Sequence, residues 1–573
     1  MSVVSPSPVF DMKPIFNRSF AAPIDGVWRA LIGTVVIMIM GCNPPPRPEL
    51  GERNTTLTAD DLTDIDTVAP LVESSATPSE FSGVWETWQA YYMRGKHVGY
   101  SHVRVEPVTA DPESAVRVTM TDQLLLRRGP ASIPQRFTQT STESRTGELQ
   151  SFTAELLVGP AATRFDGEVT NGRLTITTRR GGKRSNVSIP WKSEYRGPVG
   201  LQQSLLNRPI ARGEQRQLSA LMPIRFAVAK LRLECQHEAS IAMPDGSVRK
   251  ALEIDVSLTP DDGPPLSTVV WVDLLGNVIK TYTPSLDLVA FDSTRQAATE
   301  GLVASDDILT ATAIEVDGRF DPVGKSKRVT YEVLPRTRGD ETSDPPVVGP
   351  QPGQSVQPSD TGGYRLWVSR DRDESPPAGY IDSRLLPTAE DSDPGPLIDS
   401  DDSLIKRLAA AASPARGEPS RVAIDLAKSA HTLIRNRGYG QGIVPASVVV
   451  RNASGDCSAH AILLTALLRA RGIPARVVVG LMSVPDTDTE AGDTERMAFH
   501  MWVIAHVDDD WLHLDSTLAD GLAGADRIVL GTHHLADGNE YDAVAPVVGA
   551  IGRIKVRIVD SAAAAEPSAS LTQ

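Results

Sequence analysis

The sequence predicts an α+β protein in which a large antiparallel β-rich domain precedes a domain of mixed helices and strands. Three observations lead to this prediction. Hydrophobic and polar residues alternate between about residues 84 and 335, hydrophobic residues recur at helical spacing after residue 400, and a Pro- and Asp-rich stretch separates the two patterns. The 573 residues are 40% hydrophobic and 23% charged, which is ordinary for globular domains.

The charge balance excludes one class of function. The chain has 72 acidic and 57 basic residues, and its formal net charge is −15. A nucleic-acid binder needs a basic face that displaces counterions from phosphates, so no nucleic-acid partner is expected. Cysteines number only three, which excludes a disulfide framework.

A short apolar segment near the N-terminus indicates export. The uncharged run ALIGTVVIMIM follows Arg29 and ends at Gly41-Cys42. This run is shorter than the roughly 20 residues of a membrane-spanning helix, but it suits the core of a secretory signal. Its end resembles the lipobox of bacterial lipoproteins, in which the cysteine carries the lipid. We therefore expect a lipoprotein-type signal peptide at 1–41, lipidation at Cys42 and a disordered tether at 42–83; a plain signal peptide or a short anchor helix is the alternative.

Strand-like segments separated by short turns fill residues 84–335. WETWQAYYMR, Gly95-Lys96 and HVGYSHVRV indicate a hairpin, and later two-residue turn signals are Asn171-Gly172, Asp245-Gly246 and Gly276-Asn277. Because no amphipathic helices alternate with these strands, the sheet is expected to be antiparallel. One short helix is expected near residues 199–206.

A change of composition marks the next boundary. Residues 336–400 are rich in Pro, Gly, Ser and Asp, and we expect them to be a linker with one brief strand at 364–368. Residues 401–560 then combine helical and strand patterns, including the helix CSAHAILLTALLRAR, which ends before Gly472. Residues 561–573 are expected to be a disordered tail.

Cys457 is a candidate nucleophile because it falls in the first turn of that helix, which Ser454 or Asp456 can cap. N–H groups and the helix dipole stabilise a thiolate at such a position, lower the pKa of the thiol and can bind an oxyanion. For a lone cysteine, an inert buried side chain is the usual alternative.

Two further residues can complete a triad with Cys457. His500 begins the strand HMWVIAHV, and Asp515 ends the strand WLHLD. If these strands form a hairpin with an even-numbered loop, paired residue numbers sum to 1017 and Trp502 lies opposite Asp515. His500 is then one diagonal step from Asp515 on the same face, a separation that two side chains can bridge. An odd-numbered loop would place Asp515 on the other face.

In this order the motifs resemble the transglutaminase-like superfamily of thiol enzymes, whose fold is papain-like. Gly455-Asp456-Cys457 and the following helix are similar to the nucleophile motif, AFHMW to the histidine strand and WLHLDST to the aspartate strand. The resemblance covers about residues 400–560. It implies that Cys457 is the nucleophile, His500 the base and Asp515 the acid that orients the base. More loosely, the β-rich region resembles the one that precedes this domain in some bacterial envelope members.

The resemblance implies an exported thiol enzyme that attacks a carboxamide or peptide carbonyl and forms a thioester. Transglutaminase-like transfer to an amine and hydrolysis by water, as in a cysteine protease or amidase, both stay open. The implied partners are a protein or peptide substrate in the bacterial cell envelope and the membrane that holds the lipid anchor, facing the periplasm or exterior. No cofactor or metal is implied. A catalytically silent envelope binding or scaffold protein with the same fold is the alternative.

Other polar residues near these motifs have simpler interpretations. Cys457 and His460 are spaced to begin a zinc site, but no second ligand pair accompanies them. His513 is expected at the surface or flank of the site, and Cys235 is expected to be an inert strand residue. The acidic loop PDTDTEAGDTE lacks the ligand spacing of a calcium loop and is expected to be a solvated lid.

Overall fold

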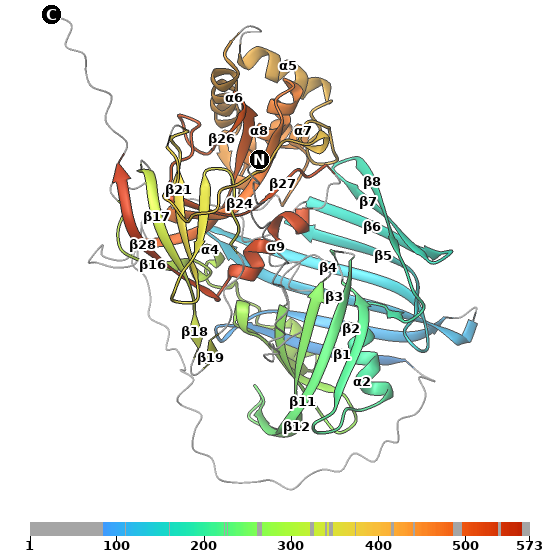
Figure 1. The fold of residues 1–573 in the computed structure, drawn as a ribbon. Helices are drawn as coiled ribbons and strands as arrows, with labels where there is room; N and C mark the ends of the chain where they lie inside the picture. The colour runs from blue at the N-terminus through green and yellow to red at the C-terminus, as the bar shows by residue number, and fades with distance from the viewer. Residues whose placement is uncertain are drawn as a thin grey trace, which may run out of the picture.

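The computed structural model describes residues 84–563, except for 109–110, 160, 223, 226, 261–265, 321–325, 339–340, 343–347, 373, 414–416, 439–441, 485–494 and 537–539. The expected signal peptide, Cys42, the tether, the last ten residues of the tail and nearly all of the acidic loop lie outside the described residues. Figure 1 shows two large sheets in different parts of the molecule, with most helices beside the second sheet. Within the described ranges, no helix has the length and apolar character needed to cross a membrane.

Among the residues that the structure describes, the first sheet contains 15 strands, most of which pair with their neighbours in sequence. Two antiparallel runs, β1 to β8 and β10 to β15, are joined where β15 pairs with β1, and β9 pairs with β10 at one end. The expected antiparallel sheet is confirmed. The strands are β1 Trp85–Met93, β2 Lys96–Val108, β3 Asp111–Arg128, β4 Ala131–Ser144, β5 Leu149–Val158, β6 Ala161–Thr170, β7 Arg173–Arg180, β8 Lys183–Pro190, β9 Tyr195–Arg196, β10 Gln215–Leu221, β11 Val228–Ala242, β12 Val248–Pro260, β13 Leu266–Val272, β14 Val278–Thr283 and β15 Leu288–Ser293.

Left-handed backbone at two hairpin turns explains why the turn signals were visible in the sequence. Asn171 and Gly172 join β6 to β7 with φ of 52° and 71°, and Arg94 and Gly95 join β1 to β2 with φ of 48° and 76°. Positive φ at both central residues defines the type I′ turn, whose twist matches that of paired strands. The first turn thus lies one residue earlier than the expected Gly95-Lys96.

The second sheet is built from strands that lie far apart in the sequence. Its order is β20-β21-β17-β28-β16-β25-β24-β27, and β26 pairs with β25. These strands are β16 Ile314–Asp317, β17 Ser326–Pro335, β20 Gln354–Pro358, β21 Tyr364–Ser369, β24 Ala475–Val484, β25 Glu495–Val507, β26 Asp510–Leu514, β27 Arg527–His533 and β28 Ile554–Ala563. Two further pairs are short: β18 Thr337–Arg338 with β19 Glu341–Thr342, and β22 Asn436–Arg437 with β23 Ser454–Gly455.

The boundary between the two sheets differs from the expected one. The sequence pattern assigns β16 and β17 to the β-rich domain and makes 336–400 a linker, yet β16, β17, β20 and β21 all belong to the second sheet. Alternation identifies a strand but carries no information about which sheet the strand joins. We call the residues up to β15 the first domain and those from β16 onward the second domain. β28 also extends three residues into the expected tail.

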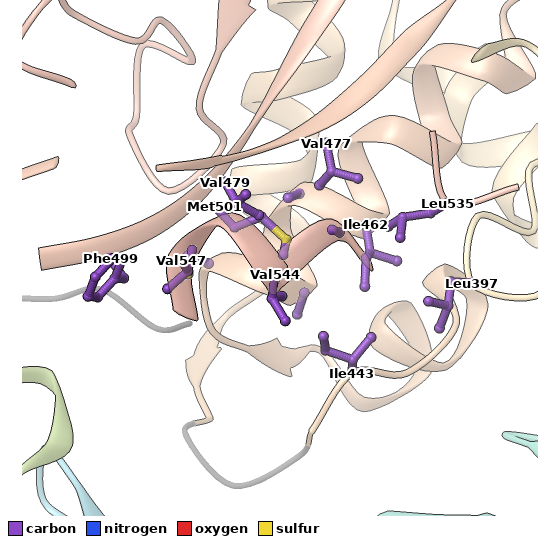
Figure 2. Close-up of a cluster of buried hydrophobic side chains, with 14 of the residues drawn as sticks. Leu397, Ile443, Ile462, Val477, Val479, Phe499, Met501, Leu535, Val544 and Val547 are labelled. Atoms are coloured by element: carbon purple, nitrogen blue, oxygen red, sulfur yellow. The ribbon is translucent and has the colours of Figure 1, made fainter. Parts of the chain in front are cut away.

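The helix that begins at Cys457, α8 (Cys457–Ala470), runs through the core of the second domain. Its residues 463–468 are fully buried, which fits a helix that is apolar on every side. Figure 2 shows Ile462 of α8 in one cluster with Val479 of β24, Met501 of β25 and Val544 of α9. The other helices are α2 Gly200–Asn207, which confirms the expected one, α3 Arg295–Thr299, α4 Ile308–Ala311, α5 Ser403–Ala412, α6 Pro419–Leu433, α7 Ala446–Asn452, α9 Glu540–Ala550 and the short η2 Pro284–Leu286 and η3 Ala389–Asp391.

One side chain ties together the two end strands of the second sheet. Gln354 of β20 is fully buried, and its amide nitrogen donates to the carbonyl of Val529 in β27 at 2.9 Å. The amide oxygen of Gln354 accepts from the N–H of the same residue at 2.8 Å. Since β20 and β27 are the last strands of the path, the sheet closes on itself through this residue.

Candidate active site

Cys457 is the first residue of α8, and the preceding Asp456 is its N-cap. One carboxylate oxygen, Oδ1 of Asp456, accepts from the backbone N–H groups of Ser458 at 2.9 Å and Ala459 at 3.3 Å. The sequence left Ser454 and Asp456 open as caps, and the structure selects Asp456. The Cys457 side chain is therefore held in the first turn, where the helix dipole favours a thiolate. Its exposed fraction is 1%.

A tight hairpin brings His500 and Asp515 together. Asp508 and Asp509 connect β25 to β26 with φ of 54° and 61°, again a type I′ turn. Val503 pairs with Leu514, which is the register that an even-numbered loop predicts. His500 Nε2 and Asp515 Oδ2 are 2.7 Å apart, and both side chains are at most 1% exposed.

The Asp515 carboxylate accepts hydrogen bonds from Arg527 and Thr517 as well as from His500. Oδ2 also accepts from Arg527 Nη2 at 2.8 Å, and Oδ1 accepts from the backbone N–H and the hydroxyl of Thr517 at 2.9 and 2.6 Å. Burial alone would raise the pKa of Asp515, but the charges of His500 and Arg527 hold the pKa well below its usual range. The group therefore stays ionised at any physiological pH.

His500 is positioned to exist as an imidazolium. Burial acts to lower the pKa of His500, but the charge and hydrogen bond of Asp515, together with the Cys457 thiol that contacts the ring, raise the pKa to about 9. Because Nε2 is bonded to Asp515, Nδ1 is the nitrogen left for the thiol. The three predicted side chains thus lie together: His500 bonds to Asp515 and is next to the Cys457 thiol, while Nδ1 of His500 makes no hydrogen bond within the described residues.

No sequence motif predicted the aromatic and histidine side chains that surround these three residues. Trp502 stacks on His500 with ring centroids 5.9 Å apart, and its Nε1–H donates to His513 Nδ1 at 3.0 Å. His513 Nε2 in turn donates to the carbonyl of Pro352 at 2.8 Å. His513 is therefore buried, contrary to the expected surface or flanking position, because β26 turns this side chain into the interior beside Trp502. Burial lowers the pKa of His513 well below its usual value, so it stays neutral.

His460, one helical turn after Cys457, makes its hydrogen bond to Ser516, outside the group of Cys457, His500 and Asp515. Its Nδ1 lies 3.3 Å from the hydroxyl of Ser516, and His431 Nδ1 donates to the Ser516 carbonyl at 3.0 Å. Burial lowers the pKa of His460 to about 4. Among the described residues, no three His, Cys, Asp or Glu side chains gather as they would around a metal ion.

A comparison with protein families agrees with the resemblance seen in the motifs. Residues 402–516 match the family model of the transglutaminase-like superfamily. The periplasmic domain of TgpA from Pseudomonas aeruginosa, solved bound to ethylmercury, is 18% identical over 36% of this chain and 88% of that chain, with a TM-score of 0.22. A β-barrel-like protein of a domain of unknown function from Brucella abortus is 8% identical over 36% of this chain and 94% of that chain, with a TM-score of 0.28. No curated protein matches the chain.

The segment matched by the family model contains Cys457, His500 and Asp515. Residues 402–516 of the second domain are therefore transglutaminase-like, and this superfamily consists generally of enzymes. The expected fold class, a transglutaminase-like domain after a large antiparallel β-rich region, is confirmed.

Proposed function

We propose that this protein is an exported thiol enzyme that acts on amide or peptide carbonyls through Cys457, His500 and Asp515. The observation that carries the proposal is the 2.7 Å contact between His500 and Asp515, formed beside a cysteine at a helix N-terminus. An ionised thiol next to an imidazolium is the activated nucleophile of this class of chemistry.

In the first step, the Cys457 thiolate attacks the carbonyl carbon and a C–S bond forms. The positive end of the α8 dipole stabilises the oxyanion that forms on the carbonyl oxygen. As the C–N bond breaks, the His500 imidazolium gives its proton to the leaving amine, and a thioester remains.

In the second step, neutral His500 takes a proton from water or from an acceptor amine, which attacks the thioester. The thiolate leaves and the starting ion pair is restored. Throughout both steps Asp515 keeps Nε2 of the imidazole protonated and directs Nδ1 to the reacting atoms. Hydrolysis and cross-linking differ only in the acceptor, and the geometry serves both.

The proposed setting is the bacterial cell envelope, with a lipid on Cys42 as the anchor and an envelope protein or peptide as substrate. The short apolar segment that ends at Gly41-Cys42 supports this setting. Replacing Cys42 by Ser should release the protein from the membrane fraction. Quantitative recovery of the variant with membranes would favour an uncleaved anchor instead.

Thioester trapping tests the catalytic proposal. An envelope extract incubated with the enzyme and quenched in acid should yield a covalent acyl adduct on Cys457, as found by mass spectrometry. Cys457→Ala should remove the adduct, and Cys235→Ser, the matched control, should retain it. Iodoacetamide at pH 6 should label Cys457 and leave Cys235 unmodified.

A catalytically silent binding protein is the second candidate, and the burial of the three residues favours it. Cys457, His500 and Asp515 are each at most 1% exposed, so a substrate needs an opening that the described residues do not provide. Slow labelling of Cys457 at every pH from 5 to 9, at the rate of Cys235, would support this candidate over the enzyme.

A further inference from the structure

Three alternate turns of the first sheet contact the second domain, and one of these contacts is at the start of α8. The β3–β4, β5–β6 and β7–β8 turns lie at the same end of their strands. A Cβ atom added at Gly442 would meet Val158 at 3.2 Å, and one added at Gly181 would meet Pro445 at 2.9 Å. Figure 1 shows the ends of β7 and β8 beside α7. The two domains are therefore in contact through Gly442 and Pro445, in the segment that leads into α7.

The contact nearest to Cys457 is a buried ion pair. Arg128, the last residue of β3, places Nη1 2.8 Å from Asp456 Oδ2, and the two side chains are 3% and 6% exposed. The other oxygen of Asp456 is the cap of α8. A single carboxylate thus links the first sheet to the N–H groups of the helix turn that holds Cys457.

We infer that Arg128 of the first domain is a positioning residue for Cys457, an inference that rests on the proposed function. Asp456 is the right cap for α8, but its negative charge lies next to the thiol that must ionise. In a buried site, a carboxylate without a cation would oppose the thiolate. Arg128 neutralises this charge and fixes the second oxygen, so that Asp456 caps the helix without raising the cost of the thiolate.

Through Arg128, the first domain contributes a positive charge to the active site and is more than a separate substrate-binding module. A purely structural role of Arg128 can be distinguished from a positioning role, because a second ion pair also joins the two domains. Arg180 of β7 donates from Nη1 to Oε2 of Glu540 in α9 at 2.7 Å, and these side chains are 9% and 3% exposed. This pair is buried like the first but does not involve the cap of α8, which makes it the matched control.

The test measures the rate of Cys457 alkylation by iodoacetamide from pH 5 to 9, together with the thermal midpoint, in the full-length protein. Arg128→Gln should move the alkylation midpoint upward by about one pH unit, which is about a tenfold slower reaction below the midpoint. Arg128→Lys, which keeps the charge, should restore most of the profile. Arg180→Gln should lower the thermal midpoint and leave the alkylation midpoint in place.

Combining Arg128→Gln with Asp456→Asn removes both charges and should return the alkylation midpoint towards that of the wild type. Equal alkylation midpoints in Arg128→Gln and Arg180→Gln, or a shift that persists in the double variant, would overturn the inference. If Arg128→Gln alone does not fold, Arg128→Lys and the double variant carry the same comparison. A wild-type Cys457 that titrates like Cys235 would instead remove the proposed function itself.

Discussion

The two sheets differ in how far along the chain each strand finds its partners. In the first sheet most neighbours are consecutive strands joined by short turns, such as Arg94-Gly95. In the second sheet β16, at residues 314–317, pairs with β25 and with β28, which ends at residue 563. Distant pairing costs loop-closure entropy that is recovered only when the whole sheet forms. The first sheet therefore depends on local signals, and the second on the simultaneous assembly of distant segments.

Each domain also has one buried cysteine, and the two thiols have different surroundings. Cys235 in β11 and Cys457 are 2% and 1% exposed. Burial raises the pKa of the Cys235 thiol, as expected for an inert strand residue. Cys457 has a helix N-terminus and an imidazole beside it. Equal burial is therefore combined with different electrostatic surroundings, and the difference comes from segments that only the second domain brings together.

Removing the N-terminal 400 residues should have the largest effect, which is a loss of stability of the second sheet. The remaining fragment lacks β16, β17, β20 and β21, so β28 loses its partners β16 and β17, and β25 loses β16 but keeps β24 and β26. We expect no cooperative thermal transition by calorimetry. A matched fragment that begins at residue 301 keeps all four strands and should unfold cooperatively. Equal transitions in both fragments would show that the second sheet does not need its distant strands.

Replacing Asp515 by Asn should lower turnover by roughly 10⁴-fold, because the side chain no longer fixes the tautomer of the His500 imidazole or balances its positive charge. Alkylation of Cys457 should fall much less, since the helix terminus still favours the thiolate. Thr517→Val is the control: it removes one uncharged donor to Oδ1 and keeps the carboxylate, so a loss of about tenfold or less is expected. Similar losses in both variants would argue against a charge-based role for Asp515.

The pH dependence should reflect His500, whose pKa is raised to about 9. The imidazolium is present below that pH, so kcat/KM should fall on the alkaline side with a midpoint near 9. Because the folded pKa lies above the usual 6.5, the stabilising contribution of His500 is complete below about pH 6.5 and is lost as pH rises through about 9. Urea unfolding at pH 6, 8 and 10 measures this loss. In Asp515→Asn, the alkaline limb should move to lower pH.

The smallest expected effect concerns the turn that sets the register of the site. Asp509 has φ of 61°, a region that glycine adopts at less cost than other residues. Asp509→Gly should therefore raise the free energy of unfolding by up to about 1 kcal/mol without changing turnover. Asp508→Asn, which tolerates the same region, should be nearly neutral. A destabilised Asp509→Gly would mean that the aspartate side chain itself holds the turn.

Much of the candidate site could be predicted from local pattern. Asp508 and Asp509 permit a two-residue turn, and the pairing of Val503 with Leu514 then places His500 beside Asp515. Arg527 and Arg128 could not be predicted in this way. β27 contacts β24 rather than β26, and β3 is in another sheet, so no spacing in the sequence relates either arginine to the residue that it binds. For the same reason, the sequence pattern placed the domain boundary at residue 335, although β16 and β17 belong to the second sheet.

The amide of Gln354 has a consequence beyond the shape of the second sheet. An end strand normally presents a row of unsatisfied N–H and C=O groups, which is a template for association with another chain. Val529 lies on such a strand, yet its N–H and C=O both bond to the one side chain. Gln354 thus substitutes for a neighbouring backbone at that point of β27. At Val529, therefore, the backbone groups that could pair with a strand of another molecule are already bonded within the protein.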